Sequence, residues 1–138
     1  MGTQTEKRFS VSLVWGIIAT LFGLMTIKEG ASVLFFDGPS RAAAGNYVPF
    51  VLMFNFLAGF FYAIAGLAII KKKNWAQHLA AFLGISSALT FAFLGFHISN
   101  GGLFEMRTVY AMTLRTSFWI LTFVFLYLQN RKGLSHAG

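Results

Sequence analysis

Hydrophobic residues along the chain gather in four long stretches, and each is long enough to cross a lipid bilayer. A helix rises about 1.5 Å per residue, so about 20 apolar residues cross about 30 Å of hydrocarbon and satisfy every backbone hydrogen bond internally. The sequence therefore predicts an all-α membrane protein, with a single domain over residues 1–138. The predicted transmembrane helices are residues 11–36, 47–70, 75–98 and 108–128.

The polar links between these stretches are short. They cover residues 37–46, 71–74 and 99–107, so consecutive helices should be antiparallel neighbours in one bundle.

The composition is that of a membrane protein: 57% of residues are apolar and 11% are charged, against about 25% charged in soluble domains. The chain has no cysteine, which excludes a disulfide-stapled scaffold. A soluble globular enzyme is excluded as well.

The cationic residues divide unequally between the two sides of the predicted bundle. One side carries Lys7, Arg8, Lys71, Lys72, Lys73, Arg131 and Lys132. The other carries Lys28, Arg41, Arg107 and Arg115. The positive-inside rule makes the first side cytoplasmic, so both termini should be cytoplasmic in a multi-pass protein of the cell (inner or plasma) membrane. The net charge of +7 then reflects attraction to anionic membrane lipids, and no nucleic-acid partner is expected.

Small residues at helical spacing indicate where helices pack closely. In lipid, helices associate mainly through close contact at small residues and through hydrogen bonds. The predicted packing positions are Gly59 and Gly66 in the second stretch and Ala80, Gly84 and Ala88 in the third, where alanine or glycine recurs every fourth residue. This pattern favours packing within the chain, and the alternative is a surface for another membrane subunit or a second copy.

Three polar residues fall at one depth within the predicted helices. The fourth helix must begin before Arg115, because residues 116–129 would make a helix of only about 21 Å. Counting along the helices places Arg115 about 10 Å and Asn55 about 12 Å below the outer interface. Glu29 lies about 10 Å deep if the first helix continues to Phe36.

We interpret these residues as an intramembrane polar cluster of Glu29, Asn55 and Arg115. A buried charge is tolerated mainly when it is paired and hydrogen-bonded, so a Glu29–Arg115 ion pair is expected, with Asn55 bonded to one partner. In the alternative, the first helix ends at Ile27, and Arg115 extends its long side chain out to the surface.

A second group of polar residues lies near the outer face, and comprises His97, Glu105, Arg107 and Tyr110. With the phenylalanines around them, they have the chemistry of a slot for a quinone or another amphipathic lipid. The alternative is a solvated loop that collects helix-end charges.

A metal or haem site is not supported by the spacing of the histidines. His97 and Glu105 have no cysteine and no second ligand at short spacing. His78 and His97 are 19 residues apart on one predicted helix, which separates them by about 28 Å, so they cannot share a haem iron. No cofactor is assigned, apart from the quinone or lipid.

The segment from Gly59 to His97 combines a glycine-broken span, a basic turn, an alanine-rich span and a terminal histidine. In these features it resembles the small four-helix membrane proteins of the DoxX type, over less than a third of the chain. The resemblance implies a four-helix membrane fold, and no activity or site residue is carried over from it.

The sequence contains no nucleophile elbow, phosphate-binding loop, zincin helix or cysteine pair, so it favours a non-catalytic role. Our interpretation is a small accessory or structural subunit that packs within a larger membrane assembly or with its own copies. The alternative is a protein that binds a lipid, quinone or ion at the outer polar residues.

Overall fold

The chain folds into helices alone, as the sequence predicts. The computed structural model describes residues 2–36 and 38–137, with side chains for residues 11–36 and 38–131. It is 86% helix, and its described residues form no strand. The helices are α1 (Gly2–Leu34), α2 (Pro39–Ala44), α3 (Pro49–Ile70), α4 (Trp75–Ser99) and α5 (Met106–Ala137).

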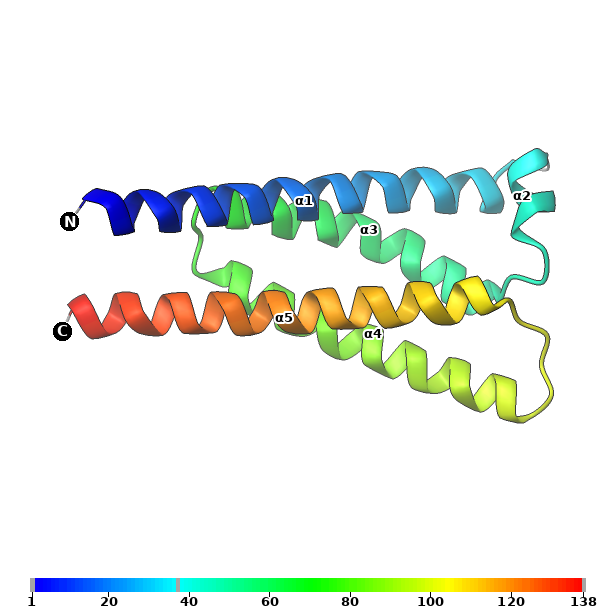
Figure 1. Cartoon of the computed structure of the whole chain (residues 1–138). Coiled ribbons are helices and arrows are strands. Elements are labelled where there is room, and N and C mark those ends of the chain that lie inside the picture. Colours follow the sequence, from blue (N-terminus) through cyan, green and yellow to red (C-terminus); the bar gives the residue numbers. More distant parts are fainter. Residues whose placement is uncertain (1, 37, 138) are drawn as a thin grey trace.

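Four of the helices are long and apolar enough to cross a membrane. These segments are Val11–Leu34, Pro49–Ile70, Trp75–Ser99 and Met106–Arg131. Both chain termini lie at one end of the molecule, and α2 lies at the other (Figure 1). We call these the terminal end and the α2 end. The short helix α2 was not anticipated, because its six residues lie within a segment that the hydropathy pattern marks only as a link.

Helices α1 and α3 pack with their backbones in direct contact. A Cβ added at Gly66 would lie 2.6 Å from the backbone nitrogen of Thr20. A Cβ added at Gly23 would lie 2.7 Å from the carbonyl oxygen of Gly59, and Gly16 faces the carbonyl oxygen of Gly66 at 2.8 Å. Small residues allow membrane helices to approach this closely. The glycines of the first two predicted spans therefore lie against each other.

Helix α4 packs on α5 through only part of its alanine and glycine stripe. Ala76, Ala80 and Gly84 are buried, whereas Ala88 and Ala92 are exposed. Each residue turns a helix by about 100°, so a repeat of four residues drifts by about 40° per step and by about 120° from Ala76 to Ala88. The buried face of α4 continues instead through Ser87, Thr90 and Leu94. Ala88 thus lies outside the packing face.

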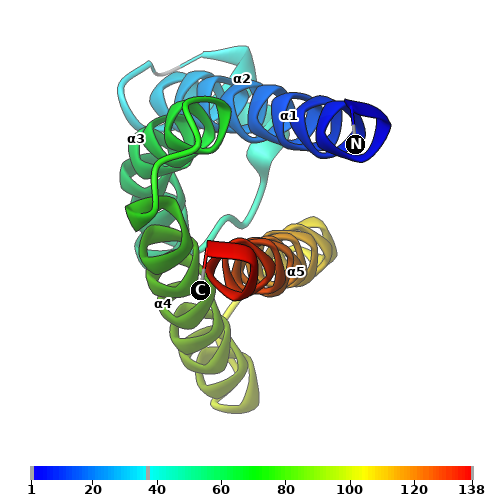
Figure 2. The ribbon, with the colours of Figure 1, turned by 90° about the vertical axis from the view of Figure 1, so that its left-hand side faces the viewer.

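Helices α1 and α5 face each other without backbone contact. Among the described residues, no Cα atom of α1 lies within 8 Å of a Cα atom of α5. Figure 2 shows α1, α3 and α4 along an arc, with α5 facing its concave side. The side-chain hydrogen bonds between α1 and α5 run from Gln129 Nε2 to Ser12 Oγ (2.9 Å), from Trp15 Nε1 to Thr122 Oγ1 (2.8 Å) and from Arg115 Nη1 to Thr26 Oγ1 (2.9 Å).

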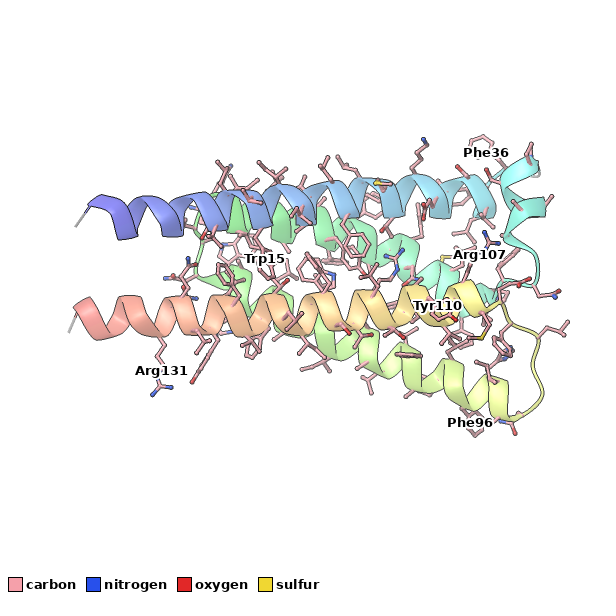
Figure 3. All side chains as sticks on the ribbon, in the orientation of Figure 1. Trp15, Phe36, Phe96, Arg107, Tyr110 and Arg131 are labelled. Carbon is pink, nitrogen blue, oxygen red and sulfur yellow. The ribbon has the colours of Figure 1, made fainter. Side chains whose placement is uncertain are left out.

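Aromatic side chains fill the space between α1 and α5. Trp15 extends from α1 toward α5 (Figure 3) and stacks on Phe125, with ring centroids 4.8 Å apart. Phe22 meets Phe118 edge to face at 5.4 Å. Trp119 of α5 is completely buried in the same core. Part of the large phenylalanine content of the chain therefore serves to connect two helices whose backbones do not touch.

Candidate functional site

Helix α1 continues without interruption through the charged residues Lys28 and Glu29. Gly30 follows them on the packed face, where an added Cβ would lie 2.8 Å from the Cβ of Phe56. Lys28 and Glu29 are both exposed. The alternative in which this helix ends at Ile27 is therefore wrong, because the glycine at position 30 serves close packing and does not terminate the helix.

An arginine from α2 holds the end of α1. Arg41 Nε donates to the carbonyl oxygen of Val33, and Arg41 Nη2 donates to that of Leu34, both at 2.8 Å. The last carbonyls of a helix have no partner within the helix, and cationic side chains satisfy them well. The position of Arg41 in the sequence indicates only a charge in the link and gives no sign of which carbonyl oxygens its side chain reaches.

A cavity of about 590 Å³ lies at the α2 end, where α1, α3 and α5 surround it. Its polar lining includes Lys28, Glu29, Asn55, Glu105, Arg107 and Arg115. Its apolar lining includes Val33, Val48, Val51, Leu52 and Ala111. The cavity thus brings together Glu29, Asn55 and Arg115, the three residues that the sequence placed at a common depth.

Arg115 is buried, with 8% of its surface exposed. Its Nη1 donates to Thr26 Oγ1, and its guanidinium carbon lies 5.0 Å from the ring centroid of Phe22 and 5.7 Å from that of Tyr62. Glu29 and Arg115 are both described and both line the cavity, but they form no ion pair. The expected Glu29 partner is replaced by a threonine hydroxyl and two aromatic faces, because the Glu29 side chain is exposed.

Several buried polar atoms near the cavity and in the adjoining core have no hydrogen-bond partner among the described residues. They are Asn55 Oδ1, Tyr62 Oη, Ser87 Oγ, Arg115 Nε, Thr116 Oγ1 and Trp119 Nε1. Buried polar groups in proteins are nearly always paired, either with protein or with a bound molecule. Asn55 and Arg115 are the members of this set that line the cavity.

Glu105, directly before α5, and Arg107, in its first turn, fasten the start of α5 to the end of α2 and to the loop that follows it. Glu105 Oε1 accepts a hydrogen bond of 2.9 Å from the backbone N–H of Asn46. Arg107 Nη2 donates to the carbonyl oxygen of Ala43, and Figure 3 shows this side chain extending from α5 toward α2. Gly45, with φ +64°, permits the close approach of Glu105. Both charged residues therefore form part of the cavity wall.

His97 and Tyr110 lie apart from that wall. His97 lines a second cavity of about 400 Å³ with Phe50, Phe93 and Phe96, and its Nε2 lies 3.0 Å from the carbonyl oxygen of Leu103. Tyr110 is 68% exposed and lines neither cavity (Figure 3). The outer-face group that the sequence proposed is therefore divided between two cavities and the surface.

The described residues contain no group of three or more histidine, aspartate or glutamate side chains that could hold a metal ion. The cavity at the α2 end offers instead two guanidinium groups, an ammonium group, a carboxamide, two carboxylates and an aliphatic wall. These groups suit an organic molecule that has both polar and apolar parts.

Comparison with protein families, with curated proteins and with solved structures finds no match to this chain. The likeness of residues 59–97 to DoxX-type proteins therefore carries no argument about function.

Proposed function

We propose that the chain is a multi-pass protein of the cell membrane, with four antiparallel spans and both termini in the cytoplasm. In support, the turn that carries Lys71 to Lys73 lies at the same end as both chain termini (Figure 1). This end holds most of the lysines and arginines, as the positive-inside rule requires of a cytoplasmic side. At the α2 end, Phe36, Phe96 and Tyr110 are strongly exposed (Figure 3), and Tyr110 suits the aromatic belt of an outer membrane interface.

We further propose that the protein binds an amphipathic ligand, a lipid or a quinone, in the cavity at the α2 end. One observation carries this proposal: Asn55 Oδ1 and Arg115 Nε are buried beside the cavity without a partner among the described residues. Leaving a buried polar atom unsatisfied costs about 1–3 kcal/mol. A ligand that presents an acceptor to Arg115 Nε, or a donor to Asn55 Oδ1, would remove the cost for that atom.

The shape and lining of the cavity support an amphipathic occupant. Its volume of about 590 Å³ falls within the range of roughly 300–1,000 Å³ that is usual for small-molecule sites. Val33, Val51 and Leu52 give it an apolar wall, while Asn55 and Arg115 supply polar groups. A ligand with a polar head and a hydrocarbon part would match both surfaces.

Native mass spectrometry of the protein purified in a mild detergent tests the proposal. We expect the unmodified chain to retain a small molecule, or to take one up from added phospholipids, fatty acids and quinones. Asn55→Leu should reduce this binding, because it removes a polar group from the cavity wall. Thr113→Val changes an exposed position on α5 and should leave binding unchanged. If none of these molecules binds the unmodified chain, the proposal is wrong.

A second candidate function, a structural or accessory subunit, rests on the exposed part of α4. Ala88, Ala92 and Gly95 are exposed, and a Cβ added at Gly95 would meet no atom within 4 Å. Such a smooth face would allow a helix of a second copy or another subunit to approach closely.

This candidate predicts association that depends on the smooth face of α4. Ala92→Phe should break a complex that is stable in mild detergent, whereas Ser117→Phe, a comparable enlargement at an exposed position of α5, should not. The mass of the native particle measures this. A chain that remains monomeric in mild detergent and in nanodiscs would exclude the subunit role.

A further inference from the structure

We infer that the ligand in the α2-end cavity carries an anionic oxygen group, a carboxylate or a phosphate, that accepts hydrogen bonds from Arg115. This inference rests on the function proposed above and specifies the chemistry of the ligand's polar head.

Arg115 is a buried cation without a neutralising partner among the described residues. Its one hydrogen bond to a side chain goes to Thr26, whose hydroxyl is neutral. The rings of Phe22 and Tyr62 present the negative faces of their π systems to the guanidinium group. These faces compensate part of its positive charge. Nε is buried and unpaired. A guanidinium ion presents several donors in a planar fork that matches a carboxylate or phosphate.

The carboxylates of the cavity wall do not supply an anionic partner for Arg115. Glu29 is exposed and forms no ion pair with Arg115, as described above. Glu105 already accepts a hydrogen bond from the backbone of Asn46. Lysine and arginine contribute three positive charges to the lining and glutamate contributes two negative charges. Among the described lining residues one positive charge therefore has no matching negative charge, and a monoanion would balance it.

The position of Arg115 along α5 sets how deep in the bundle the head group must lie. Arg115 lies nine residues after Met106, where α5 begins, so it is about 13 Å along the helix from the α2 end. In the membrane orientation proposed above, a head group bound there must enter the cavity together with part of its hydrocarbon. The aliphatic wall formed by Val51, Leu52 and Ala111 would contact that hydrocarbon. A single-chain anionic amphiphile, such as a fatty acid, meets these requirements.

The chain offers a fluorescence assay for this inference. Trp119 lies one helical turn after Arg115, and Trp15 packs in the same core. The third tryptophan, Trp75, is exposed at the terminal end of α4, and Trp75→Phe removes its signal. Bromine atoms quench tryptophan fluorescence at short range, so a dibrominated stearate and its uncharged methyl ester form a matched pair of probes.

We expect the acid to give saturable quenching at a concentration roughly tenfold or more below that of the ester, because a hydrogen bond to a charged group adds this much affinity. Arg115→Gln should abolish the difference between acid and ester. The matched control Arg131→Gln alters an exposed arginine on the same helix, and should preserve the difference. The comparison of acid with ester at an intact Arg115 needs no variant in the cavity, so it holds even if Arg115→Gln fails to fold.

The other outcomes separate the inference from the proposed function. Equal saturable binding of acid and ester would overturn the anionic head while leaving an amphiphile-binding protein. Absence of saturable quenching by both probes, and by brominated phospholipid and quinone analogues, would overturn the binding function itself. Inorganic phosphate supplies the anion without a tail. If phosphate binds in an Arg115-dependent way and neither stearate probe does, the anionic head is supported and its source is a soluble ion.

Discussion

Helix α1 meets α3 and α5 in opposite ways. Against α3 it presents glycines, and the backbones approach so closely that an added Cβ at Gly66 would lie 2.6 Å from a backbone nitrogen. Against α5 it presents Ser12, Trp15 and Thr26, whose side chains form hydrogen bonds with side chains of α5. Among the described residues, no Cα atom of α1 lies within 8 Å of a Cα atom of α5.

The difference indicates where this bundle has room for a ligand. Glycine-to-glycine packing leaves no volume between the helices, and the Thr20 hydroxyl beside Gly66 donates to the carbonyl oxygen of Gly16 within its own helix. The separation of α1 from α5 leaves space for large aromatic rings, for hydrogen bonds between side chains and, at the α2 end, for the cavity. The α1–α3 contact gives rigidity, and the α1–α5 interface carries the polar chemistry.

The largest effect is expected from a side chain placed in the α1–α3 contact. In Gly66→Leu the new Cβ would meet the backbone nitrogen of Thr20 and the carbonyl oxygen of Gly16. Because backbone atoms cannot move aside as a flexible side chain can, we expect a loss of about 3 kcal/mol in the free energy of unfolding. Reversible unfolding in mixed detergent micelles measures it. Gly95→Leu is the control, since a Cβ there meets nothing within 4 Å. Equal stability of the two variants would contradict the close contact.

A smaller effect is expected from the loss of one hydrogen bond between α1 and α5. Thr122→Val keeps the side-chain shape but leaves the indole N–H of Trp15 without its acceptor. The cost should be about 1–2 kcal/mol, measured by the same unfolding assay. Thr113→Val is a matched control, because both hydroxyls also donate to a carbonyl four residues earlier, while Thr113 is exposed. A cost for Thr113→Val as large as that for Thr122→Val would show that the bond to Trp15 contributes nothing.

A double-mutant cycle isolates a weaker bond between these helices. Gln129 Nε2 donates to Ser12 Oγ at 2.9 Å, so Ser12→Ala and Gln129→Leu should show a coupling energy of about 0.6 kcal/mol, as is typical for bonds between membrane helices. The control cycle combines Ser12→Ala with Asn130→Leu, because Asn130 donates to Gln77 on α4. Coupling of equal size in both cycles would indicate that the Ser12–Gln129 bond is not specific.

The smallest effect is expected on the exposed part of α4. Ala88→Leu should change the free energy of unfolding of the monomer by less than about 0.5 kcal/mol, as is usual for surface positions. Ala80→Leu, two steps earlier in the same stripe, enlarges a completely buried residue and should cost about 1–3 kcal/mol. Unfolding of the monomeric protein in micelles compares them. A large cost for Ala88→Leu under these conditions would place this residue in the packed interior.

Hydropathy was sufficient to predict the four long helices, although not the short helix α2. The all-α fold and the four long apolar helices are confirmed, because an apolar segment of this length satisfies its backbone only as a helix. Counting along these helices also brought Glu29, Asn55 and Arg115 to one depth, and all three line one cavity. Depth along a helix follows from residue number alone.

The angles and distances between helices could not be predicted from residue number. Spacing in sequence shows which residues share a helix face, but not which neighbour that face meets or how far away it lies. Arg115 therefore contacts Thr26 in place of Glu29, and His97 and Glu105 line different cavities. The stripe that begins at Ala76 turns out of the packed face before Ala88.

The sequence by itself determined that this protein consists of apolar helices with a few polar residues at a shared depth, since each of these properties depends on a single helix. The tertiary structure alone decided that α1 touches α3 through glycine and stays apart from α5, because the distance between two helices depends on the side chains of both. That separation creates the cavity, and it leaves Arg115 as a buried cation without an anionic partner among the described residues.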